Sequence, residues 1–378
     1  MGAGGTTRRE LAALVGAGTA AAIASALLGP RAAQARLARG MPADMIQLNG
    51  NESPYGPSTA ARAAMTRAQD VAARYPGDLE EELRVTLASL HGVTPEQIAL
   101  GCGSGEILRM ADMAFLGLDR KVVVAEPTFE AVLVYAGVTR AEAVKVPLDA
   151  DFRHDLARMA EACDGRCGLV YVCNPNNPTG TVVTTAQLGA FLRRVPPAAT
   201  VLLDEAYLHF VENPACRSGL DLLPEFPNLI IVRTFSKVYG MAGMRLGYAV
   251  AARAKIEAMR QHVTFNNANA AVLLAALASL ADSELVPQVK RRMNDTRRWL
   301  CAELAKDGRR AIPSEANFVM IDVGGDVAPL IDGFKQRKIL VGRRFPSMPT
   351  WLRVSVGTPE EMVAFLAALR ALAPAAVA

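Results

Sequence analysis

The sequence predicts an α/β protein with a mostly parallel sheet, followed by a smaller α+β region. Short apolar runs alternate with segments of helical spacing, which is the pattern of parallel strands joined by helices. Polar segments that contain glycine or proline follow several of these runs directly. Because ligands of open α/β sheets bind beyond the carboxyl ends of the strands, we expect those segments to converge on one crevice.

Composition and charge limit the classes of protein that this chain can belong to. Its 378 residues are 51% hydrophobic, which is enough for a substantial core in two domains. The formal net charge of +4 is small and both signs are mixed, so we expect no nucleic-acid partner. The six cysteines form no zinc-type pair of pairs and the four histidines are scattered, so we expect no metal site.

The first 35 residues are not expected to belong to the folded domain. Thr7-Arg-Arg-Glu-Leu11 leads into an uncharged stretch, 11–28, and Ala33-Gln-Ala35 is a small-x-small cleavage site. The arginine pair resembles a twin-arginine export signal, so we interpret 1–35 as the signal peptide of a periplasmic or otherwise exported protein. The stretch is too weakly hydrophobic for us to expect a stable membrane association. The alternative is a chance arginine pair in a disordered start, which would leave the protein cytoplasmic.

An N-terminal arm follows in residues 36–70, which we assign together with part of the small domain. Its segment Leu48-Asn-Gly-Asn-Glu-Ser-Pro-Tyr-Gly-Pro57 contains two prolines and two glycines, which exclude a regular helix and favour an extended arm. Tyr55 on such an arm is suited to contact a ligand or another subunit. Helices are expected over 58–73 and 79–91, separated by a Pro-Gly break.

The large domain is predicted to span residues 71–265, and the small C-terminal domain residues 266–378. In the large domain a helix is expected over 106–116, and strands over 98–100, 121–125, 143–146, 168–173, 201–203, 228–232 and 246–251. In the small domain, one helix is expected over 268–280, a second from a cap at Asp282-Ser283 to Lys306, and a third over 359–372. Strands are expected there over 317–323, 339–341 and 352–356.

The segment Thr234–Arg245 follows one of these strands with a hydroxyl, a lysine, two glycines and an arginine. Burial at a strand end disfavours the ammonium form of Lys237 and makes its amine chemically useful. Ser236 and Arg245 add a hydroxyl donor and a fork-shaped cation, both of which bind phosphate. We hypothesise that Lys237 forms an imine with a phosphate-bearing aldehyde cofactor. Taken alone, the segment is explained equally well as a surface Ser-Lys pair in a glycine-containing loop.

Other strand ends supply groups that such a cofactor needs. Gly103-Ser-Gly105 precedes a helix and offers backbone N–H groups to an anion, although many glycine-rich turns are merely tight turns. Asp204 ends a very apolar strand and is costly to bury unless it pairs with a cation, such as a protonated ring nitrogen. Side chains suited to contact a flat ring or its oxygen also follow strands: Tyr207, Asn174 and Phe129.

These motifs together resemble those of the fold-type-I, pyridoxal-phosphate-dependent aminotransferases of class I/II. The resemblance rests on Asn174-Pro-Asn-Asn-Pro-Thr-Gly180, Asp204-Glu-Ala-Tyr207, and Ser236-Lys237 with Arg245 eight residues later. The arm motif, Glu126-Pro-Thr-Phe129 and Trp351-Leu-Arg-Val-Ser-Val-Gly357 narrow it to the histidinol-phosphate aminotransferase group. The resemblance covers essentially the whole mature chain, with the motifs in the family's order.

The resemblance implies a seven-stranded, mostly parallel sheet sandwiched by helices in the large domain, and pyridoxal 5'-phosphate as cofactor. It implies that Lys237 holds the cofactor as an imine and that Asp204 pairs with the pyridinium nitrogen; with Tyr207 these are the expected catalytic residues. Asn174 and Tyr207 would contact the ring hydroxyl, and Phe129 the ring face. The phosphate would be held by Ser104, Gly105, Ser236 and Arg245.

The resemblance also implies a homodimer with shared active sites, in which Tyr55 reaches the cofactor phosphate of the other subunit. Arg353 would bind the substrate carboxylate with two hydrogen bonds, and Asn174 and Arg343 would contribute to the substrate site. Three positions depart from the family's pattern: Ser53, Phe129 and the segment Val341-Gly-Arg-Arg-Phe-Pro346. Arg343 and Arg344 in that segment either contact a distal phosphate or carboxylate or face solvent.

The implied activity moves an amino group from a donor, histidinol phosphate or an aromatic or other amino acid, to a 2-oxo acid, with 2-oxoglutarate expected. A first alternative is an amino-acid decarboxylase or lyase on the same scaffold, similar to threonine-phosphate decarboxylase. A second alternative is a non-catalytic exported protein that binds pyridoxal phosphate or a partner.

Overall fold

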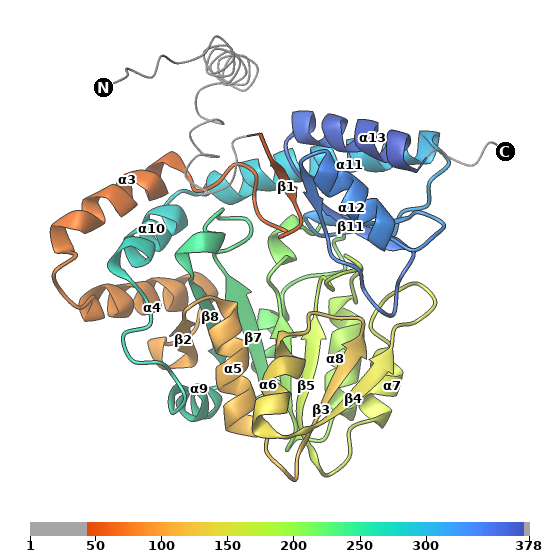
Figure 1. Cartoon of the computed structure of the whole chain (residues 1–378). Coiled ribbons are helices and arrows are strands. Elements are labelled where there is room, and N and C mark those ends of the chain that lie inside the picture. The colour runs from red at the N-terminus through yellow and green to blue at the C-terminus, as the bar shows by residue number, and fades with distance from the viewer. Residues whose placement is uncertain (1–43, 374–378) are drawn as a thin grey trace, which may run out of the picture.

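The computed structural model describes residues 44–373, which form a large α/β part and a smaller α+β part (Figure 1). The predicted signal peptide, residues 1–35, lies outside the described residues. The described chain begins in the small part, crosses to the large sheet and returns, so the small part is built from both of its ends (Figure 1).

The large part is organised around a seven-stranded sheet with the order β2-β8-β7-β6-β5-β3-β4. All neighbours pair in parallel except β8, which runs antiparallel to both β2 and β7. This mostly parallel sheet confirms the predicted fold class, and each predicted strand is present with its ends within two residues. The strands are β2 (Ile98–Gly101), β3 (Lys121–Glu126), β4 (Glu142–Pro147), β5 (Cys167–Cys173), β6 (Thr200–Asp204), β7 (Leu229–Thr234) and β8 (Gly247–Ala251).

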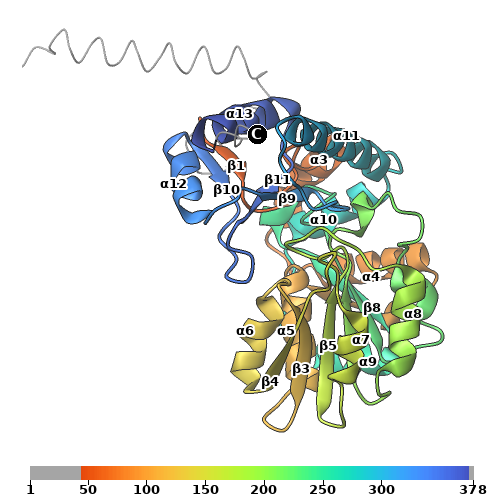
Figure 2. The same cartoon turned by 90° about the vertical axis from the view of Figure 1, so that its right-hand side faces the viewer.

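Helices cover both faces of this sheet (Figure 2). Along β5, Leu169 and Tyr171 pack into the core on one face, whereas Val170 and Val172 pack into the core on the other. A strand that is buried on both faces is apolar at every position, which explains the continuous apolar runs in the sequence. The helices are α5 (Ser104–Phe115), α6 (Ala131–Thr139) and α9 (Arg253–Arg260) on the first face, and α7 (Leu156–Glu161) and α8 (Thr185–Arg194) on the second.

The small part contains two two-stranded sheets. In the first, β1 (Ile46–Leu48) pairs in parallel with β10 (Ile339–Val341), which joins the N-terminal arm to the C-terminal region. In the second, β9 (Phe318–Asp322) and β11 (Trp351–Ser355) are antiparallel. The remaining helices are α3 (Thr59–Arg67), α4 (Gly77–His91), α10 (Ala270–Leu280), α11 (Leu285–Lys306), α12 (Ala328–Gln336) and α13 (Pro359–Leu372), with α3 packed against α10.

The arm contains the extended backbone that was predicted, and its residues Ile46–Leu48 form β1 by pairing with a distant strand. The structure corrects two local predictions. The helix expected over 58–73 ends at Arg67 and continues as a 3-10 turn, Ala68–Val71. The N-cap of α11 is Glu284, because Asp282 accepts a hydrogen bond from the Glu284 N–H in a turn that precedes the helix. The domain boundaries at 70 and 265 stay predictions.

Within residues 44–373, no single helix combines the length and the apolar composition of a membrane span. The pair α10 and α11 meets those two criteria only when taken together, and the two helices are bent by 86° relative to each other.

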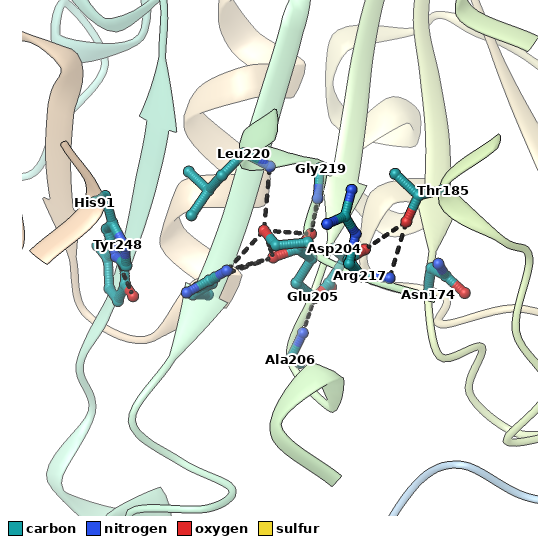
Figure 3. Close-up of polar contacts among 12 residues, drawn as sticks. His91, Asn174, Thr185, Asp204, Glu205, Ala206, Arg217, Gly219, Leu220 and Tyr248 are labelled. Atoms are coloured by element: carbon teal, nitrogen blue, oxygen red, sulfur yellow. Dashed lines mark hydrogen bonds and ion pairs between the residues drawn. The ribbon is translucent and has the colours of Figure 1, made fainter. Parts of the chain in front are cut away.

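A buried ion pair joins the ends of the two central strands β6 and β7. Arg233 on β7 and Glu205 directly after β6 are 8% and 2% exposed, and the Arg233 Nη2 to Glu205 Oε2 distance is 2.9 Å. The Glu205 carboxylate also accepts a hydrogen bond from the Gly219 N–H (Figure 3). It accepts another from the Ser218 hydroxyl. A buried charge with this many partners holds its neighbours in place, and one of those neighbours is Asp204.

This pair makes a stability prediction. Arg233→Met should lower the free energy of unfolding by about 3–5 kcal/mol, because it leaves the buried Glu205 carboxylate without its cation. The measurement is urea denaturation of the purified protein. The matched control is Arg193→Met, which breaks an ion pair with Glu225 whose side chains are 59% and 58% exposed. That loss should cost about 1 kcal/mol or less. Equal effects of the two substitutions would contradict the prediction.

Candidate active site

The polar segments after the strands converge on one cavity of about 450 Å³ at the carboxyl edge of the large sheet. It is closed on its other side by residues of the arm and of the loop after β10. Of the residues that the sequence singled out, the cavity is lined by Ser104, Gly105, Phe129, Asp204, Tyr207, Ser236, Lys237, Arg245, Arg343 and Arg353. Asn174 and Tyr55 do not line it.

Lys237 presents its amine to this cavity from the segment after β7. Its Nζ donates to the carbonyl of Gly50 over 3.2 Å and lies 5.4 Å from the centre of the Tyr207 ring. Burial lowers the pKa of Lys237 from 10.5 to about 8, and the positive charge of Arg353 acts in the same direction. The charges of Glu52 and Asp204 oppose that shift. A neutral, nucleophilic amine is therefore available close to neutral pH.

Asp204 ends β6 with its side chain 2% exposed at the floor of the cavity. Its carboxylate accepts hydrogen bonds from the Tyr171 hydroxyl at 2.9 Å and the Ala206 N–H at 3.0 Å. Burial raises the pKa of Asp204, and no ion pair to it occurs among residues 44–373. A cation entering the cavity would therefore find a preformed, poorly hydrated carboxylate.

The first turn of α5 forms an anion cradle on one side of the cavity. Ser104 and Gly105 begin the helix, where backbone N–H groups are free and the helix dipole is positive. The guanidinium of Arg245 lies so close to Gly103 that a Cβ there would be 2.1 Å from Arg245 Nη2. Ser236 adds its hydroxyl to the same cavity. One cation, one hydroxyl and a helix N-terminus together suit a phosphate.

Asn174 does not occupy the position that the sequence predicted for it. Its side-chain N–H donates to the Val183 carbonyl over 3.0 Å, and its side-chain oxygen accepts from the Val183 N–H, also over 3.0 Å. Asn177, three residues later in the same motif, faces the cavity instead and donates to the Tyr207 hydroxyl over 3.4 Å. The repeated asparagines of this motif are why residue type alone selected the wrong one.

The arm contributes site residues that sequence reasoning missed. Three consecutive residues contact three different site residues: the carbonyls of Asn49 and Gly50 accept from Arg353 and Lys237, and the Asn51 side chain donates to the Tyr207 hydroxyl. Asn51 adopts a left-handed backbone with φ of 51° and is held by Ser355 and Asn317. The polar, glycine-containing arm motif was the available signal, but only Tyr55 was singled out from it, as a contact to a ligand or another subunit.

Arg353 on β11 is 9% exposed and retains unused hydrogen-bonding capacity. Its Nη1 donates to the Asn177 side chain at 2.6 Å and its Nη2 to the Asn49 carbonyl at 2.8 Å. Its Nε is buried and has no hydrogen-bond partner among residues 44–373. Because Arg353 itself lines the cavity, its guanidinium offers a positive charge to an anionic ligand there.

Two further residues named in the sequence analysis lie apart from this cavity. Tyr55 is half-buried with its ring 5.5 Å from the Arg292 guanidinium, and burial raises the pKa of its hydroxyl. Arg344 makes three hydrogen bonds to Asp326, of 3.0, 2.9 and 2.7 Å, on the exposed side of the loop. Of the adjacent arginines, Arg343 is therefore the one that faces the cavity, and Arg344 is not.

The functional groups that line this cavity match those that pyridoxal phosphate needs. Asp204 offers an unpaired carboxylate to a protonated ring nitrogen, and Lys237 a partly neutral amine to an aldehyde. The α5 N-terminus, Ser236 and Arg245 suit the phosphate.

Comparisons with known proteins agree with this chemistry. Residues 43–369 match the family described as aminotransferase class I and II. The chain is 40% identical over 330 residues to a histidinol-phosphate aminotransferase of Symbiobacterium thermophilum, covering 87% of this chain and 90% of the relative. It is 38% identical over 281 residues to an aromatic amino acid aminotransferase of Cutibacterium acnes, covering 74% and 80% of the two chains.

Among solved structures, the chain resembles histidinol-phosphate aminotransferase from Sinorhizobium meliloti in complex with pyridoxal-5'-phosphate. The TM-score is 0.81 at 27% identity, covering 86% of this chain and 90% of that chain. The match to the family extends over most of the described fold and includes every strand that borders the cavity. The chain therefore belongs to the class I and II aminotransferases, as a pyridoxal-phosphate-dependent enzyme of the histidinol-phosphate aminotransferase type.

Proposed function

We propose that this aminotransferase moves the amino group of an amino acid or amine to a 2-oxo acid, with 2-oxoglutarate as the expected acceptor. The observation that carries the proposal is the grouping of three functional groups on one cavity: the Lys237 amine, the Asp204 carboxylate and the Arg353 guanidinium. The relatives named above are aminotransferases, and they give no support to decarboxylation.

Each residue has a defined task in this proposal. Pyridoxal phosphate, when bound, supplies an electron-poor ring that withdraws electrons from the carbon that bears the amino group. Asp204 keeps the ring nitrogen protonated, and Tyr207 donates its hydroxyl proton to the ring oxygen. The Tyr207 hydroxyl accepts from Asn51 and Asn177, which leaves its own proton free to be donated. Lys237 Nζ removes the proton from the substrate carbon as a neutral amine and returns it during the transfer.

Arg353 orients the substrate by binding its anionic group. Asn177 and Asn49 already hold the Arg353 guanidinium through its two terminal nitrogens, so the guanidinium is preorganised. A carboxylate bound there places the neighbouring carbon of an amino acid within the same cavity as Lys237. The relatives' names suggest donors with a flat ring, either the imidazole of histidinol phosphate or an aromatic side chain.

We also propose a homodimer with shared active sites. Tyr55 lies on the arm that borders the cavity, yet its own ring is directed toward Arg292 and not into this protomer's cavity. This position is compatible with a contact to the cofactor phosphate of the second subunit.

We further propose that the protein is exported through a twin-arginine signal in residues 1–35. The support is the motif Thr7-Arg-Arg-Glu-Leu11, the uncharged stretch behind it and the cleavage site at Ala33-Gln-Ala35. Export in the folded state suits an enzyme that acquires its cofactor in the cytoplasm.

Lys237→Ala tests the assignment of the lysine. The variant should lose covalent attachment of the cofactor, measured by borohydride reduction and mass spectrometry, and its kcat should fall by about 10²- to 10⁴-fold because no other amine replaces the base. Products are followed as the 2-oxo acid and as carbon dioxide. A variant that keeps full turnover, or a wild type that releases carbon dioxide in place of the 2-oxo product, would overturn the proposed function.

Arg353→Gln tests the electrostatics of the lysine independently of turnover. In the wild-type apoprotein, covalent capture of pyridoxal phosphate should rise with pH around the Lys237 pKa of about 8. The substitution removes a positive charge that favours the neutral amine, so the midpoint should move to higher pH. Arg344→Gln, which lies outside the cavity, should leave the midpoint unchanged. A midpoint that stays or falls in Arg353→Gln would show that the two groups are not coupled.

Export is tested by replacing Arg8 and Arg9 with lysine. The double variant should remain in the cytoplasmic fraction with its leader uncleaved, because the twin-arginine route reads the arginine pair itself. Arg31→Lys, in the same leader, serves as the control and should be exported normally. Equal recovery of all three proteins from the exported fraction would rule out this route.

A further inference from the structure

The carboxylate of Asp204 is held at both of its oxygens. Its Oδ2 accepts a hydrogen bond from the Tyr171 hydroxyl at 2.9 Å, and its Oδ1 accepts one from the Ala206 N–H at 3.0 Å. Within residues 44–373, Tyr171 is the one side chain that donates to this carboxylate. Because each oxygen has its own donor, the carboxylate is kept from rotating and its remaining lone pairs have a fixed direction.

Tyr171 reaches Asp204 from the neighbouring strand. It lies on β5 opposite Leu202 of β6, and Cys173, two residues later, lies opposite Asp204. Side chains two residues apart on a strand share a face of the sheet, so the fully buried Tyr171 ring extends along that face toward the carboxylate. Its partner on β3 is Val124, and the core around the ring is otherwise apolar. A hydroxyl buried there is costly without an acceptor, and Asp204 is that acceptor.

Asp204 has both charged and uncharged titratable neighbours. The positive charge of Lys237 favours the ionised carboxylate, whereas the adjacent Glu205 disfavours it. Burial raises the pKa of Cys173 and of Tyr207, so both of these groups stay uncharged. Burial also raises the pKa of Asp204 itself. A neutral donor that favours the ionised form therefore has a defined effect at this position.

We propose, on the basis of the function above, that Tyr171 is a positioning residue that keeps Asp204 ionised and directed at the ring nitrogen of pyridoxal phosphate. Burial and the charge of Asp204 raise the pKa of Tyr171 well above its usual value, so its hydroxyl stays protonated and remains a donor. A hydrogen bond to the charged form of an acid lowers the pKa of that acid. The Asp204 carboxylate is thus available to a cation at a lower pH than burial alone would allow.

The test measures how tightly the apoprotein binds pyridoxamine phosphate across pH. This probe has the ring nitrogen of the cofactor but no aldehyde, so the Lys237 amine is not consumed. Tyr171→Phe keeps the buried ring and removes only the hydroxyl. Because an ionised Asp204 pairs with the protonated ring nitrogen, affinity should fall as the pH drops through the pKa of Asp204 in the apoprotein.

Loss of the Tyr171 hydrogen bond raises that pKa, so the low-pH limb of the binding profile should move up by about 1 pH unit. On this limb the affinity of Tyr171→Phe should be about 10-fold below that of the wild type. At higher pH both apoproteins hold an ionised Asp204, and the two affinities should converge. A purely structural defect would instead lower affinity by the same factor at every pH.

Tyr248→Phe is the matched control. Tyr248 is also buried in the large sheet, at 3% exposed, and its hydroxyl lies 2.9 Å from His91 Nε2, away from Asp204 (Figure 3). This variant loses one buried hydroxyl and should bind the probe with the wild-type pH profile. The deaza analogue of the probe, with carbon in place of the ring nitrogen, is the second control. Tyr171→Phe should not weaken its binding, because Asp204 has no ring nitrogen to pair with.

An acid limb that stays in place, an equal loss of affinity at all pH values, or an equal loss for the deaza analogue would overturn the role of Tyr171. Asp204→Asn separates this role from that of Asp204: it should weaken binding of the probe, and adding Tyr171→Phe should then move no limb of the profile. A wild type that transaminates no amino donor would contradict the proposed function. The binding profiles would still decide whether Tyr171 controls the ionisation of Asp204.

Discussion

The active site depends on a carboxylate that is buried without a cation of its own. Asp204 is 2% exposed at the end of the central strand β6, and its partners there are a tyrosine hydroxyl and a backbone N–H. Such a group is costly to keep charged, so the fold must hold it in place. The Glu205–Arg233 pair joins the ends of β6 and β7 directly beside it, and Lys237 follows β7 into the same cavity. The protonated ring nitrogen of bound pyridoxal phosphate would supply the missing cation, as proposed above.

The arm turns this open sheet edge into an enclosed site. By pairing with β10, β1 fixes residues 49–51 against groups from the large sheet and from β11. Lys237, Tyr207 and Arg353 therefore share a wall made of backbone carbonyls and one asparagine side chain. A shift of β1 would disturb the amine, the phenol and the substrate arginine together. The contacts of this short segment thus join the two parts of the fold at the reacting groups.

Much of this organisation could be predicted from sequence because the responsible signals are local. Strands buried on both faces are continuous apolar runs, and most of the residues singled out at their ends line one cavity, with Asn174 the exception. Asn174 was chosen over Asn177 because the sequence does not reveal which of two identical side chains is hydrogen-bonded to the backbone. The role of residues 49–51 depends on a strand pairing almost 300 residues away, which leaves no local pattern. The partner of Arg343 was likewise unpredictable, since Glu130 comes from the other part of the molecule.

Arg353 and Arg343, two of the three arginines that line the cavity, show how burial sets the strength of a charged contact. Arg353 is largely desolvated, so an anion that contacts its guanidinium would gain a strong, charge-assisted hydrogen bond. Arg343 is half-exposed and shares its charge with Glu130, so that ion pair contributes little to stability. Either partner of the exposed pair can therefore be replaced without leaving a buried charge behind, whereas the loss of one partner of the Glu205–Arg233 pair leaves one.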